Sequence, residues 1–156
     1  MSILVAIDPG TKYLGVSIWE DGVLSRAYLS NVDDFLHLGP RTSSSDQMSQ
    51  CNELVIEKMQ VFRSSIASDL INISLISGEV AGMLRYSRMS KVTYLPFRKW
   101  KGNLPKKVTT ERTLAVLSPQ EKKRIELPKA VKTLGHNVYD SVGLGLYFLL
   151  KNGKRK

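Results

Sequence analysis

The sequence has one cysteine, no long uninterrupted apolar run, and few acidic residues between positions 85 and 132. Because Cys51 is alone, no internal disulfide can form, and no N-terminal signal pattern is visible, so we expect a reduced, cytoplasmic protein. The longest apolar stretch, near the C-terminus, is interrupted by glycines and is too short to cross a bilayer, so we expect no membrane partner. A length of 156 residues with 42% hydrophobic content suits one globular domain over residues 1–156.

Positive charge is abundant and unevenly placed. The chain carries a formal net charge of +9, and residues 85–132 hold 14 Lys or Arg residues against three acidic ones. Such a charge run is often only a solvated face that keeps a protein soluble. Its imbalance in so short a chain favours a polyanionic partner, and we expect segment 85–132 to bind nucleic acid.

The hydrophobic pattern predicts an α/β fold with five strands flanked by helices. The first three strands are separated by short turns and form an antiparallel meander, and two further strands follow later in the chain. Residues 31–50 form a long connection with room for one helical turn, and the basic stretch 98–107 is predicted to be irregular. The expected strands cover 2–8, 13–19, 23–29, 53–57 and 91–95, and the expected helices cover 64–86, a segment capped by Thr109 or Thr110, a short one starting at Ser118-Pro119, and 137–150.

Three carboxylates follow or interrupt apolar segments. Asp8 ends the first strand, Glu57 ends the fourth, and Asp140 lies near the start of the last helix. A buried carboxylate is costly unless it is paired or bound to a cation, and an oxygen-only ligand set suits Mg²⁺ or Mn²⁺. Simpler explanations are a turn-forming role for Asp8 and an ion pair of Glu57 with Lys58 or Arg63.

Three motifs together resemble a known family. IDPGTKYLGVSIW (7–19), VIEKMQVF (55–62) and HNVYDSVGLGLYFL (136–149) are similar, in order and spacing, to the RuvC-type Holliday-junction resolvases of the RNase H-like superfamily, including the short phage versions. The first motif is shared with YqgF-type RNA-processing nucleases and actin-like phosphotransferases. The resemblance implies an RNase H-like fold, in which two parallel strands join the antiparallel meander in one five-stranded mixed sheet. It also implies a location in the cytoplasm of a bacterium or a phage-infected host.

The resemblance implies a Mg²⁺-dependent endonuclease that nicks four-way junctions in pairs and leaves 5′-phosphates. Asp8, Glu57 and Asp140 match the metal-binding carboxylates of the family, which hold two Mg²⁺ ions that Mn²⁺ can replace. The family has Asp or His where this chain has Asn137, and His136 precedes it. Asn137 is therefore either a natural variant in which His136 helps, or an introduced change that traps an inactive form; His136 alternatively caps the helix.

The family resemblance also suggests residues that bind DNA. Lys101 and Arg112 fall at the positions of two functional lysines, the first of them close to the scissile phosphate. Met59 and Phe62 resemble the apolar loop that inserts at the crossover, although core packing explains Phe62 almost as well. Trp100 either stacks on a base or packs on the sheet. The remaining expected phosphate contacts are Arg98, Lys99, Lys106 and Lys107.

Helix 64–86 is apolar around most of its circumference, so two surfaces must cover it. The family forms a homodimer through this helix, which would place two active sites on a junction. Alternatively, helices between 109 and 125 of the same chain cover it. Two other functions stay open: an RNase H-like nuclease acting on RNA, flaps or forks, and a branched-DNA-binding protein with impaired catalysis. Length excludes an actin-like phosphotransferase, which needs two such domains.

Overall fold

The protein is built on one five-stranded sheet, in a computed structural model that describes residues 2–40, 51–61, 65–86, 91–130 and 132–155. The order of strands across the sheet is β3-β2-β1-β4-β5. The first three strands are antiparallel neighbours, whereas β4 and β5 run parallel to β1. This confirms the predicted mixed sheet. The strands are β1 (Ile3–Asp8), β2 (Tyr13–Glu20), β3 (Val23–Asn31), β4 (Cys51–Lys58) and β5 (Lys91–Pro96).

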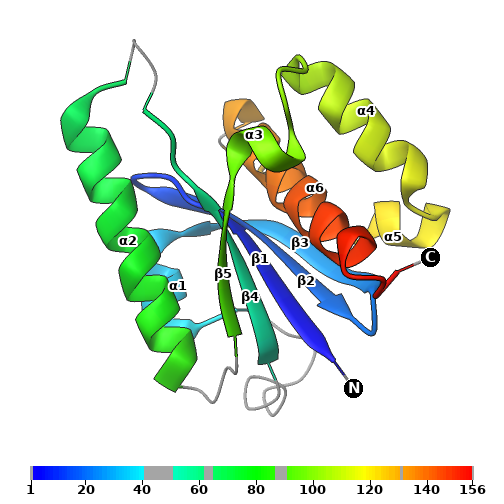
Figure 1. Ribbon diagram of the computed structural model, residues 1–156, viewed down its shortest axis with the longest axis horizontal. Coiled ribbons are helices and arrows are strands. Elements are labelled where there is room, and N and C mark those ends of the chain that lie inside the picture. The colour runs from blue at the N-terminus through cyan, green and yellow to red at the C-terminus, as the bar shows by residue number, and fades with distance from the viewer. Residues whose placement is uncertain (1, 41–50, 62–64, 87–90, 131, 156) are drawn as a thin grey trace.

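Helices cover both faces of the sheet. The two helices α1 and α2 lie on one face, and the helices that follow β5 lie on the other, with α6 against the strands (Figure 1). No helix in the described ranges is both long and apolar enough to cross a membrane. The helices are α1 (Val32–Leu38), α2 (Ala67–Tyr86), α3 (Phe97–Trp100), α4 (Lys106–Val116), α5 (Pro119–Lys123), the 3₁₀ turn η2 (Lys132–Leu134) and α6 (Gly135–Lys151).

The central strand β1 is buried on both faces, as its unbroken apolar sequence predicts. Side chains alternate along a strand, so Ile3, Val5 and Ile7 pack in the cluster beneath α1 and α2. Leu4 and Ala6 pack in the second cluster, beneath α6. Two apolar layers therefore hold the end of β1, and with it Asp8, in a fixed place.

The sequence-based predictions of helices differ from the structure in the basic region. Residues 98–107 were expected to be irregular, but they contain the end of α3 and the start of α4. Helix α4 also starts before its expected cap: it begins at Lys106, and the hydroxyl of Thr109 donates back to the Pro105 carbonyl from inside the helix. The short helix at Ser118-Pro119 is confirmed, with a capping box between Ser118 and Glu121.

Two other helix boundaries were also wrong. Helix α2 begins at Ala67 rather than at 64, and α6 begins at Gly135 rather than at 137. The expected connection over 31–50 contains the seven-residue helix α1, started by the Asn31 side chain, which accepts from the Asp33 N–H.

Helix α6 crosses the sheet closely at a glycine. A Cβ on Gly15 of β2 would lie 1.9 Å from the backbone oxygen of Asn137, so a side chain at position 15 is excluded. In β2, Gly15 is the register partner of Asp8. The close approach therefore brings the first turns of α6 to the end of β1 that carries Asp8.

Candidate active site

Two of the three predicted carboxylates are neighbours in the sheet. Strands β1 and β4 are parallel and pair Ile7 with Ile56, which places the following residues, Asp8 and Glu57, at the same edge. Asp140 approaches from α6, at the end of the helix that crosses at Gly15. All three residues are at most 9% exposed. The structure thus brings together Asp8, Glu57 and Asp140, which are far apart in the sequence.

The three carboxylates repel one another electrostatically. Burial raises the pKa of Asp8 well above its usual range, and the charges of Glu57 and Asp140 raise it further. Burial, followed by the charge of Asp140, raises the pKa of Glu57 to about 7. A site with these pKa values attracts a proton or a cation, and strongly perturbed carboxylates in a cluster are typical of functional sites.

The last residue of helix α3, Trp100, and the residue that follows the helix, Lys101, both direct their side chains at these carboxylates. The Lys101 ammonium, 3% exposed as a residue, lies 2.6 Å from Asp140 Oδ1 and lowers the pKa of Asp8 and Glu57. The indole Nε1 of Trp100 donates a 2.9 Å hydrogen bond to Glu57 Oε2. Glu57 thus pairs with Trp100 rather than with Lys58, which is exposed, and Arg63 lies outside the described residues.

The chemistry of this cluster fits a hard divalent cation. Within the described ranges, no three His, Cys, Asp or Glu side chains form a set that could hold a metal ion as they stand. In this arrangement Lys101 supplies the positive charge beside Asp140. Three mutually repelling carboxylates with only oxygen atoms to offer are nevertheless the ligand type that Mg²⁺ prefers, and a cation would relieve the repulsion.

Asn137 and His136 point to different parts of the molecule. The Asn137 amide nitrogen would lie 3.8 Å from a Cβ on Gly10, so its side chain faces the turn that follows Asp8. His136 Nδ1 lies 2.8 Å from the Thr133 carbonyl oxygen. That contact is with the preceding 3₁₀ turn and leaves Asn137, rather than His136, beside the carboxylate edge.

The sequence matches no model of a known protein family and no curated protein. Solved structures are similar along almost the whole chain. RuvC of Thermus thermophilus has a TM-score of 0.61 at 12% identity, with 97% of each chain covered. The same protein in complex with a Holliday junction substrate has a TM-score of 0.65 at 12% identity, covering 98% of this chain and 97% of the other. The yeast mitochondrial Holliday junction resolvase has a TM-score of 0.58 at 10% identity, with 97% of this chain and 79% of the yeast chain covered.

The chain has the fold of RuvC. The predicted RNase H-like fold is thereby confirmed, although the identities are too low for the comparison to transfer individual residues. The roles of the site residues therefore depend on the geometry of this chain alone.

On this RuvC-type fold, two of the residues expected to bind DNA line one groove, and the charge of one of them, Lys106, lowers the pKa of Asp8 and Glu57. Lys106 and Lys107 line a groove of about 850 Å³ between α4 and the segment before α6. The sequence analysis did not single out Lys129, Lys132 or Tyr139, which line the same groove. The lysines lie within the predicted basic segment, but the packing of α4 beside the segment before α6, which groups them, could not be predicted from their spacing.

The other expected DNA contacts are dispersed. Arg98 and Lys99 are exposed on α3, and Arg112 borders a pocket of about 210 Å³ that also includes Lys101 and Trp100. Met59 lines a pocket of about 300 Å³ beside Glu57, together with the exposed ring of Tyr94, which the sequence analysis missed. Phe62 lies outside the described residues.

Proposed function

We propose that the protein is a metal-dependent endonuclease that binds four-way DNA junctions and resolves them by paired nicks that leave 5′-phosphates. The observation that carries this proposal is the convergence of Asp8, Glu57 and Asp140 at one edge of a sheet with the RuvC fold. Two solved structures of this fold are described as Holliday junction proteins.

Each residue of the site has a proposed role. Asp8, Glu57 and Asp140, with the neutral Asn137 amide, would hold two Mg²⁺ ions, for which Mn²⁺ can substitute. When bound, such ions activate a water and stabilise the leaving 3′ oxygen of a phosphodiester. Lys101 is buried among the carboxylates and would contact the scissile phosphate once Asp140 turns to a cation. The exposed lysines of the groove would bind the backbone of a DNA arm.

The exposed face of α2 supports a homodimer. The side chains of Ile71 and Leu75 are 60% and 61% exposed, and Gly78 and Gly82 extend the same face with nothing within 4 Å of their Cβ positions. Helices α4 and α5 lie across the sheet from α2 (Figure 1), so the alternative in which they cover it is wrong. A second copy docked on this face would bring two active sites to one junction.

Nicking of a labelled four-way junction tests the proposal directly. We expect paired, symmetric nicks in Mg²⁺ and in Mn²⁺, little cleavage of linear duplex, and no cleavage by Asp8→Asn. Preferred cleavage of RNA, flaps or forks would instead favour the other nuclease function.

A binding protein with impaired catalysis is the second candidate, because Lys101 already pairs with Asp140 and because Asn137 stands where the resembled family has Asp or His. Such a protein would bind junctions equally well with and without Mg²⁺ and cut none. Asn137→Asp separates the candidates, because a full carboxylate set should hold the second ion more tightly and raise the nicking rate. An unchanged nicking rate would count against the idea that Asn137 weakens metal binding, and also against the idea that it was introduced to trap an inactive form.

A further inference from the structure

The indole of Trp100 contacts the candidate metal site directly. Its Nε1 donates a 2.9 Å hydrogen bond to Oε2 of Glu57. Among the described residues, Trp100 is thus the side chain that donates to this carboxylate. We propose that Trp100 is a positioning residue that holds Glu57 in one orientation and leaves its second oxygen for a divalent cation. This inference rests on the proposed function and assigns Trp100 a role distinct from stacking on a DNA base.

Helix α6 holds the indole in place. A Cβ on Gly143 would lie 2.7 Å from Trp100 Cζ3, so the ring packs directly against the backbone at that position. Gly143 follows Asp140 by three residues on α6, and residues at this spacing share a helix face. One face of α6 therefore presents one carboxylate and also fixes the ring that orients another. The Lys101 ammonium also lies 5.2 Å from the centre of the Trp100 ring.

Trp100 and Lys101, which are consecutive in the sequence, thus contact two different carboxylates with different chemistry. Lys101 places a full positive charge on Asp140, and this charge competes with an incoming cation. The indole of Trp100 is a neutral donor that cannot accept, so it fixes Glu57 without supplying a competing charge. Hydrogen bonds from outside the ligand set commonly fix the orientation of a metal ligand, and their removal typically weakens metal affinity about 10- to 100-fold.

Trp100→Phe tests the proposal, because it removes the N–H and keeps an aromatic side chain at this position. We expect the dissociation constant for Mn²⁺, measured by calorimetry without DNA, to rise about tenfold or more. Junction affinity in EDTA should be unchanged, and slow nicking at limiting Mg²⁺ should recover at saturating Mg²⁺. Trp19→Phe is the matched control, since Trp19 Nε1 donates to Ser17 Oγ at 3.0 Å and not to a carboxylate of the site. It should bind Mn²⁺ as the wild type does.

The fluorescence of Trp100 gives a second readout. In Trp19→Phe, Trp100 is the remaining tryptophan, and its emission should change as Mg²⁺ saturates the site. Wild-type Mn²⁺ affinity in a folded Trp100→Phe protein, or flat emission through Mg²⁺ saturation, would overturn the inference. If circular dichroism shows Trp100→Phe to be unfolded, the emission titration decides alone. If the wild type nicks junctions and Trp100→Phe has the same Mn²⁺ affinity and nicking rate, only this inference is refuted. If the wild type neither binds Mn²⁺ nor nicks junctions, the proposed function is refuted as well.

Discussion

The side chain of Asp8 works against the stability of the fold that contains it. Burial and two neighbouring carboxylates raise its pKa, which means that its charged form is disfavoured in the folded protein. Removing this charge should therefore stabilise the metal-free protein while it removes the function. Such a trade between stability and activity is expected wherever like charges are brought together to hold a cation.

We predict that Asp8→Asn raises the free energy of unfolding in EDTA by about 1 kcal/mol and abolishes nicking. Thermal melting followed by circular dichroism measures the first effect, and the junction assay measures the second. Asp34→Asn is the control, because Asp34 is exposed on α1, away from the cluster, and should leave both quantities near the wild-type values. A lower melting temperature for Asp8→Asn would show that the carboxylates do not repel one another in the folded state.

At the scale of secondary-structure elements, helix α2 has one face in the core and another in solvent. Val80 and Leu84 are buried against the sheet, while Ile71 and Leu75 are largely exposed on the opposite side. The apolar pattern around the whole helix predicted two covering surfaces, and the chain itself provides one. A second copy of α2 is the proposed second cover.

We expect Leu75→Glu to convert a dimer into a monomer, because two glutamates would be buried at the two-fold interface. Analytical ultracentrifugation measures the change, and the monomer should nick a junction without pairing its two cuts. The matched control is Val116→Glu, since Val116 is 50% exposed on α4, across the sheet. A dimer that survives Leu75→Glu, or a wild type that is monomeric at every concentration, would contradict the assignment of this face.

The sequence predicted the elements that depend on local pattern and missed those that depend on contacts between distant segments. The strands and the convergence of Asp8 with Glu57 follow from apolar runs that end at a charge, because parallel strands share their ends. Helix α3 has four residues and no side-chain cap, so its pattern gives little signal. Lys101 points inward to Asp140, which lies 39 residues further along the chain, and this contact depends on where α6 crosses the sheet. For that reason the contacts of Trp100 and Lys101 with the carboxylates could not be predicted.

At the scale of the whole molecule, lysines gather along one groove, and the charge of one of them, Lys106, acts on Asp8 and Glu57. The groove between α4 and the segment before α6 is lined by Lys106, Lys107, Lys129 and Lys132. Four lysines against one carboxylate, Glu111, leave the groove with an excess of positive charge that suits a phosphate backbone, and each phosphate contact on duplex DNA releases counterions. Binding through this groove should therefore weaken steeply as salt increases.

We predict that Lys129→Ala with Lys132→Ala reduces the slope of log affinity against log salt by about 1.8, that is, about 0.9 per lost contact. Fluorescence anisotropy with a labelled junction in EDTA measures this slope without cleavage. Lys122→Ala with Lys123→Ala is the control, because both residues are exposed on α5, in the same basic segment but outside the groove. If both pairs change the slope equally, the charge acts as a diffuse field and the groove is not a specific contact surface.

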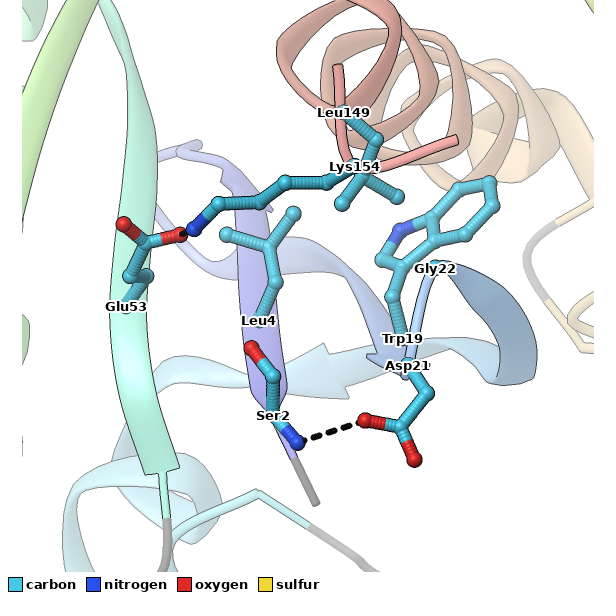
Figure 2. Close-up of a pocket in the computed structure, with 8 residues that line it drawn as sticks. All are labelled: Ser2, Leu4, Trp19, Asp21, Gly22, Glu53, Leu149 and Lys154. Carbon is cyan, nitrogen blue, oxygen red and sulfur yellow. Dashed lines mark hydrogen bonds and ion pairs between the residues drawn. The ribbon is translucent and has the colours of Figure 1, made fainter. Parts of the chain in front are cut away.

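The end of the molecule opposite the carboxylates is closed by the C-terminal residues. Lys154 pairs with Glu53 across a pocket of about 320 Å³ that also contains Trp19 and the Ser2 amide bonded to Asp21 (Figure 2). The next residue, Arg155, donates two hydrogen bonds to Glu121, at 2.6 and 2.9 Å, and its guanidinium lies 5.5 Å from the Trp19 ring. These two adjacent residues thus tie the end of the chain to β4 and α5 through one exposed and one buried ion pair.

The buried Arg155–Glu121 pair should make the stability of the fold depend on pH, and the direction of this dependence follows from the pKa of Glu121. Burial opposes its charge, but hydrogen bonds from Arg155, the Leu24 N–H and Ser118 lower its pKa from 4.5 to about 2. Since the folded pKa is lowered, the stabilisation is fully present above pH 4.5 and is lost as the pH falls toward 2. We predict that Arg155→Met, which keeps an apolar stem near Trp19, costs about 2 to 3 kcal/mol at neutral pH, less than the loss of a fully buried pair because the Leu24 and Ser118 donors remain.

Chemical unfolding of Arg155→Met across this pH range checks both parts of the prediction, because the difference from wild type should shrink as Glu121 takes up its proton in the wild-type protein. Lys154→Met removes the adjacent ion pair, in which the lysine side chain is 39% exposed, and should cost less than about 1 kcal/mol. If the two variants lose the same free energy of unfolding, burial of the Arg155–Glu121 pair adds nothing to its contribution to stability. Since both residues lie at the far end of β1 from Asp8, neither variant should change the rate of nicking at a temperature where it is fully folded.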